Sequence, residues 1–163
     1  MVILIMGVAG SGKTTIGRAL AASLGWSFRD ADDFHPAANV AKMSAGQPLT
    51  DADRAPWLAA IRAHLDDKLA RGENAVVTCS ALRESYRAQL LADPARVKLV
   101  HLTGDPALLA ARIADRTDHF MKPQMLASQL AALEPPRDAL AVDIAPPPEK
   151  IVAEIRRALS LEA

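Results

Sequence analysis

The most informative stretch of this sequence is Gly7-Val8-Ala9-Gly10-Ser11-Gly12-Lys13-Thr14. It matches the pattern G-x-x-x-x-G-K-S/T, in which glycines let a loop fold tightly and present backbone N–H groups to a phosphate. The lysine then reaches the β- and γ-phosphates, and the threonine hydroxyl ligates Mg²⁺. A glycine-rich turn with a solvated lysine is the alternative. The stretch predicts binding of a nucleoside triphosphate and does not indicate the acceptor.

The flanks of this loop favour the phosphate-binding interpretation. The apolar, β-branched run Val2–Met6 predicts a strand buried on both faces. After the loop, apolar residues recur at helical spacing from Thr14 to Leu24, and Gly25 ends the helix. The positive end of that helix dipole would point at the bound anion. The loop therefore lies between a buried strand and a helix, which is the context that a phosphate loop requires.

Short apolar runs alternate with helical patterns through the rest of the chain. This alternation is typical of βαβ units and predicts an α/β fold with a parallel sheet. A stretch over 35–50 is irregular with a short helix. We expect further strands near 26–29, 75–79, 97–102 and 140–144, and further helices near 56–72, 84–92, 106–115, 124–133 and 150–161.

The composition is that of one compact soluble domain. The 163 residues are 50% hydrophobic and 23% charged. Nineteen basic and nineteen acidic residues leave no basic excess, so we expect no nucleic-acid partner. One cysteine fits a reducing compartment, and no apolar stretch approaches the roughly 20 residues of a membrane span. The opening residues lack the basic start of a secretory signal. We expect a cytoplasmic protein with no membrane partner.

Two carboxylates follow the predicted second strand. Asp30 and Asp32 lie at the carboxyl end of that strand, where open α/β sheets bind ligands. One can hold Mg²⁺, and the other can accept a hydrogen bond from a hydroxyl nucleophile. The alternative is a solvated acidic turn, or a helix cap before Pro36.

Basic side chains supply the candidates for anion binding. Arg112 and Arg116 share one helix face and could neutralise transition-state charge or stack on a base, unless they only pair with Asp115 or Asp118. Arg54, Arg83 and Arg87 could bind an anionic substrate, although each alone is more often surface charge.

Other polar and aromatic residues are less informative. His35 could bind a substrate hydroxyl or cap a helix, and His119 could be a solvated loop residue. Cys79 is expected to be a small buried hydrophobe. Trp57 and Tyr86 are expected to be packing residues with a polar edge. The sequence shows no metal-ligand spacing of the kind zinc requires.

Several further segments, together with the phosphate loop, resemble the gluconokinases of the P-loop kinase fold. The resemblance runs nearly end to end, although Arg83 stands where the family often has lysine. The matching segments are Met6–Thr14, DADDFHP over 30–36, NVAKM over 39–43, GQPLTDADRAPWL over 46–58, CSALRESYR over 79–87, HFM over 119–121 and SQLAALEP over 128–135.

The resemblance implies a fold and a reaction. The fold would be a three-layer P-loop kinase domain over 1–163, with a five-stranded parallel sheet flanked by helices. It would carry a helical substrate-binding insert (about 35–71) and a mobile lid (about 117–135). The reaction would be ATP-dependent phosphorylation of D-gluconate at its 6-hydroxyl, and members are commonly homodimers. Rivals are a shikimate-like or nucleoside monophosphate kinase and a non-catalytic nucleotide-binding module; the chain lacks the Gly-Gly pair expected of shikimate kinases.

The motifs and the resemblance together predict a site. Lys13, Asp32 and Arg116 are predicted to be catalytic, and Thr14 with Asp30 to hold Mg²⁺. The predicted substrate-binding residues are Asp32, His35, Arg54, Arg83, Arg87 and His119. The predicted ATP-binding residues are Gly7, Val8, Ala9, Gly10, Ser11, Gly12, Lys13, Thr14, Thr15, Arg112 and Arg116.

Overall fold

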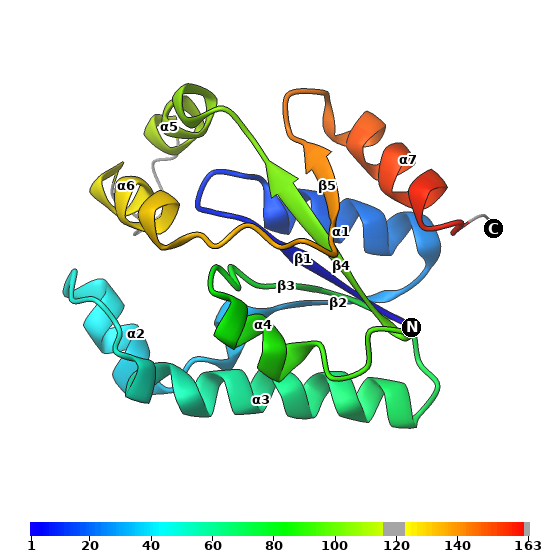
Figure 1. Cartoon of the computed structure of the whole chain (residues 1–163), viewed down its shortest axis with the longest axis horizontal. Helices are drawn as coiled ribbons and strands as arrows, with labels where there is room; N and C mark the ends of the chain where they lie inside the picture. The colour runs from blue at the N-terminus through cyan, green and yellow to red at the C-terminus, as the bar shows by residue number, and fades with distance from the viewer. Residues whose placement is uncertain (116–122, 162–163) are drawn as a thin grey trace.

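Five parallel strands form the centre of the computed structural model, which describes residues 1–115 and 123–161 (Figure 1). Their order in the sheet is β2-β3-β1-β4-β5, and every neighbouring pair is parallel. This confirms the predicted α/β class and the parallel sheet. The strands are β1 (Val2–Met6), β2 (Ser27–Asp30), β3 (Ala75–Thr78), β4 (Val97–Thr103) and β5 (Leu140–Asp143).

Helices cover both faces of this sheet. In Figure 1, α1 and α7 lie on one side and α3 and α4 on the other, which gives three layers. A short 3-10 turn, η1 (Ala31–Phe34), follows β2. The helices are α1 (Lys13–Leu24), α2 (Ala37–Ser44), α3 (Asp51–Ala70), α4 (Glu84–Leu90), α5 (Pro106–Ala114), α6 (Pro123–Ala132) and α7 (Pro148–Ala158).

The burial of β1 explains why its sequence is an unbroken apolar run. Side chains alternate between the faces of a strand. Ile3 and Ile5 pack in one hydrophobic cluster with residues of α1 and α7, whereas Leu4 and Met6 pack in the other with residues of α3. All five β1 residues are fully buried. The predicted strand with two buried faces is confirmed.

The start of α3 differs from the prediction. The sequence predicts that this helix begins near residue 56, but it begins at Asp51. Thr50 and Asp53 form a capping box there: the Thr50 hydroxyl accepts the Asp53 N–H, and the Asp53 carboxylate accepts the Thr50 N–H. Pro56 is exposed in the second turn, where water can reach the carbonyl that it leaves unpaired.

The strand order places a crevice at the carboxyl end of β1. From β1 the chain crosses to β2 and β3 on one side, then to β4 and β5 on the other. Ligands bind at such a reversal in open parallel sheets. The loops after β1, β2 and β3 meet there. Within the ranges that the structure describes, each helix is too short or too polar to cross a membrane.

Candidate active site

The loop between β1 and α1 has the backbone geometry of an anion cradle. Gly10 and Gly12 adopt positive φ angles of 80° and 83°, which other residues rarely adopt. A Cβ on Gly10 would lie 2.9 Å from the Leu109 carbonyl oxygen. Gly12 caps α1 without a side-chain hydrogen bond, so the first N–H groups of the helix are left for a ligand.

Thr14 and Asp30 come together as oxygen donors at the edge of this loop. The Thr14 hydroxyl donates to Asp30 Oδ2 over 3.0 Å. The other Asp30 oxygen accepts the Asp32 N–H over 2.9 Å, which fixes the carboxylate at the start of η1. A hydroxyl and a carboxylate beside a phosphate loop are hard oxygen donors that fit Mg²⁺. Lys13 Nζ lies 3.2 Å from the Val8 carbonyl oxygen, folded over the same loop.

Asp32 projects into an open cleft. Its side chain is 69% exposed, yet protein surrounds the cleft, and this desolvation raises the pKa of Asp32 above its ordinary value. The nearby Asp30 carboxylate raises that pKa further, while Lys13 opposes the shift. A carboxylate with a raised pKa is better suited to accept a proton from a hydroxyl.

His35 is held firmly beside Asp32. Its side chain is 4% exposed, and its Nε2 lies 4.0 Å from Asp32 Oδ1. The Asn39 amide NH₂ lies 3.2 Å from His35 Nδ1 and also donates to the Asp53 carbonyl. Because an NH₂ group can only donate, Nδ1 is the acceptor and the proton of the neutral ring is on Nε2. Burial, followed by Arg54, lowers the pKa of His35.

Two guanidinium groups lie near the ring of Tyr86. Arg54 and Arg83 lie 5.5 Å and 6.0 Å from its centroid. The Tyr86 hydroxyl donates to Asp51 over 2.7 Å and accepts from Arg54 over 3.1 Å. Arg54 also lies 3.5 Å from Asp51. The cluster offers positive charge to an anionic group on the α3–α4 side of the cleft.

The phosphate loop, the two aspartates, His35 and the two arginines near Tyr86 line one cleft of about 410 Å³. The cleft also has walls from α2 and α6, which face each other in Figure 1. Gly7, Val8 and Ser11 are buried within the phosphate loop, and Thr15 is exposed on α1 outside the lining. The predicted site residues that line the cleft are Ala9, Gly10, Gly12, Lys13, Thr14, Asp30, Asp32, His35, Arg54 and Arg83.

Two of the predicted arginines lie outside the cleft lining. Arg87, predicted to bind substrate, is buried, and its guanidinium donates to the carbonyl oxygens of Ala81, Leu82 and Glu134. These three bonds occupy it structurally, which corrects the expectation. Arg112 donates to the Ile144 carbonyl oxygen over 2.9 Å. Arg116 and His119 lie outside the described residues.

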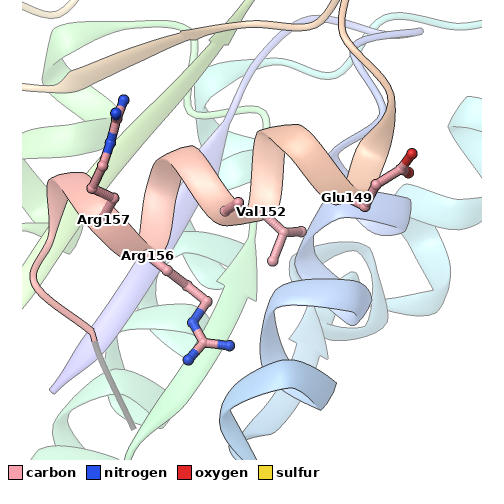
Figure 2. A pocket seen from close by; sticks show the side chains of 5 residues that line it. Glu149, Val152, Arg156 and Arg157 are labelled. Carbon is pink, nitrogen blue, oxygen red and sulfur yellow. The ribbon is translucent and has the colours of Figure 1, made fainter.

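A second, shallow hollow lies along α7 (Figure 2). All five residues that line the hollow come from α7. Figure 2 shows Arg156 and Arg157 pointing to different sides of this helix. Arg156 donates to the Ser23 carbonyl oxygen and so ties α7 to α1. The lining of this hollow includes neither a phosphate loop nor an aspartate pair, so we take the cleft as the site.

Trp57 and Tyr86 are packing residues with a polar edge, as expected: Trp57 stacks on His35, and Tyr86 packs near Arg54 and Arg83. Sequence reasoning missed two other residues that hold the site in place. Asn39 orients His35. Gln129 reaches the phosphate loop from α6. Each lies in one of the quoted matching segments, which was the available signal. Cys79 is buried as expected, and burial raises the pKa of its thiol to about 12.

The parallel sheet, phosphate loop and carboxylate-lined cleft define a kinase of the P-loop fold. An AAA domain family model matches residues 2–136. A gluconokinase from Gluconobacter oxydans is 52% identical over 136 residues, which cover 83% of this chain and 76% of that one. The chain belongs to the gluconokinase family.

Two solved structures agree with this membership. A gluconokinase from Sinorhizobium meliloti superposes with a TM-score of 0.81 at 42% identity, covering 98% of this chain and 95% of that one. An unliganded sugar kinase from a Janibacter species superposes with a TM-score of 0.89 at 39% identity, covering 98% and 94%.

Proposed function

We propose that the protein transfers the γ-phosphoryl group of ATP to the 6-hydroxyl of D-gluconate, giving 6-phospho-D-gluconate and ADP. The observation that carries this proposal is the single cleft in which the phosphate loop, the Asp30–Asp32 pair and Arg54 converge. The names of the relatives supply the substrate. Such a transfer needs a protein mainly to position the reactants and to stabilise charge.

The nucleotide would bind along the loop that begins at Gly7. Backbone N–H groups of the loop after Ala9, together with the amino end of α1, would surround its phosphates. Lys13, Arg112 and Arg116 would stabilise the transferring group. Thr14 and Asp30 would hold Mg²⁺, which would neutralise charge on the β- and γ-phosphates when bound.

The acceptor would bind on the side of α4 and of α2 and α3, the two helices of the proposed insert over 35–71. Asp32 would orient the 6-hydroxyl and accept its proton. His35, neutral at physiological pH, would donate from Nε2 to a substrate hydroxyl. Arg54 and Arg83 would bind the carboxylate, and His119 would contact the substrate from the proposed lid over 117–135.

Coupled ADP release with a panel of acceptors at fixed MgATP tests the proposal. We expect turnover with D-gluconate and little with shikimate or AMP. Preferred turnover of shikimate or AMP would favour a different small-acceptor kinase. Nucleotide binding without acceptor-dependent ADP release would favour a non-catalytic module. We further propose a cytoplasmic homodimer, which light scattering of the purified protein and cell fractionation would test.

A further inference from the structure

The matching segment Ser128–Pro135 is not explained by the chemistry described above. It covers the second half of α6 and the residues that follow this helix. Both of its ends make long-range polar contacts with described residues, and the two ends contact different halves of the cleft.

At one end, Gln129 contacts the phosphate loop directly. Its Oε1 accepts the backbone N–H of Ala9 over 2.7 Å, across 120 residues of sequence. Ala9 is only 7% exposed and lies in the middle of the loop. Buried N–H groups need a partner, so the position of α6 and the conformation of the loop depend on each other.

At the other end, Glu134 is fixed to the start of α4. Its N–H donates to the Leu82 carbonyl over 2.8 Å, and its own carbonyl accepts from Arg87 over 2.6 Å. Its carboxylate accepts the Glu84 N–H over 2.7 Å. The local cap residue of α4, Arg83, makes no side-chain cap, so Glu134 caps this helix from 50 residues away.

The helix held by Glu134 carries the acceptor side of the cleft. Arg83 and Tyr86 lie at the amino end of α4, beside the backbone groups that Glu134 and Arg87 fix. Leu133 packs against both hydrophobic clusters, so the link passes through the core as well as through hydrogen bonds. The segment is thus a continuous connection between Ala9 and α4.

We propose that Ser128–Pro135 couples acceptor binding to nucleotide binding, with Gln129 as the positioning residue at the phosphate loop. The proposal rests on the proposed function, because it takes D-gluconate as the acceptor. Binding of gluconate against α4 would hold α6 in place, and Gln129 would then hold the Ala9 amide in the conformation that binds the triphosphate. Coupling of this kind is reciprocal, so each ligand tightens the binding of the other by the same factor.

Calorimetric titration of the full chain measures this factor. A non-hydrolysable ATP analogue with Mg²⁺ is titrated with and without saturating D-gluconate, and gluconate with and without the analogue. For the wild type we expect each ligand to tighten the other about fivefold or more. Gln129→Met keeps the length of the side chain but removes the amide oxygen. We expect its coupling factor to fall below about twofold.

Gln124→Met is the matched control, since Gln124 is exposed in the first turn of the same helix and outside the cleft lining. It should keep the wild-type factor. Glu134→Ala, which uncaps α4, should lower the factor as Gln129→Met does.

Wild-type coupling in Gln129→Met, or no coupling in the wild type, would overturn the proposal while leaving the proposed function intact. Failure of gluconate to bind the wild type would instead contradict the proposed function, and the coupling with it.

Discussion

The imidazole ring of His35 and the indole ring of Trp57 stack with their centroids 4.3 Å apart and their planes 9° from parallel. Trp57 Nε1 donates to the Ala31 carbonyl oxygen over 2.7 Å. The stack is thereby fixed to η1, the turn that carries Asp32. A buried side chain of α3 therefore sets the position of two groups in the cleft.

Trp57→Phe removes the indole N–H and keeps an aromatic ring against His35. Ala31 is fully buried, so the substitution would remove a buried hydrogen bond to its carbonyl oxygen. We expect the free energy of unfolding to fall by about 1–3 kcal/mol and the KM for gluconate to rise. Urea denaturation and steady-state kinetics measure these effects. Trp26→Phe, at the edge of the other cluster, is the control. Equal effects of the two substitutions would contradict the role assigned to Trp57.

The sequence predicted the phosphate loop and its strand-loop-helix context well, because those features depend on local spacing. It also paired Thr14 with Asp30 as the residues expected to hold Mg²⁺, and their side chains lie within hydrogen-bond distance. It could not place Arg87 in the interior: no local pattern indicates that three carbonyls would satisfy a guanidinium. The contact of Gln129 with Ala9 depends likewise on packing across 120 residues.

The imidazole of His35 should have a pKa below its ordinary value. Burial and then Arg54 lower its pKa from the ordinary value of 6.5, so the ring should be neutral at pH 6.5. As the pH falls, His35 therefore takes up a proton at a higher pH in the unfolded chain than in the folded one. The free energy of unfolding should fall as the pH drops from 7 toward 5. Arg54→Ala should raise the pKa. NMR titration of the ring, assigned with His35→Gln, measures it, and a midpoint at or above 6.5 would argue against this environment.

Asp32→Asn should lower the activity of the protein and raise its thermal stability. Loss of the carboxylate should lower kcat by about 10²–10⁴-fold with little change in nucleotide affinity. Desolvation and Asp30 raise the pKa of Asp32, so its ionised form destabilises the fold at neutral pH. We therefore expect the variant to melt at a higher temperature at pH 7, with the difference shrinking as the pH falls toward 4. Near wild-type turnover would remove Asp32 from the mechanism.

Asp53 should contribute stability that acid removes. Its hydrogen bond from Lys42, and then that from the Thr50 N–H, lower its pKa to about 2. The contribution is complete above the ordinary value of 3.8 and is lost as the pH falls toward 2. Asp53→Asn should therefore lower Tm at pH 7 and approach the wild type as the pH falls toward 2. Asp66→Asn, which breaks an exposed pair with Arg62, is the control and should change Tm less. A Tm difference between Asp53→Asn and the wild type that stays constant as the pH falls would contradict the stabilising role of the Asp53 carboxylate.

The proposed transfer to gluconate is tested most directly by following the phosphorus atoms themselves. ³¹P NMR of the protein with MgATP and D-gluconate should show 6-phospho-D-gluconate and ADP appearing in equal amounts, and Lys13→Met should abolish both signals. Consumption of ATP without a sugar phosphate, or a phosphate on any other hydroxyl, would contradict the account.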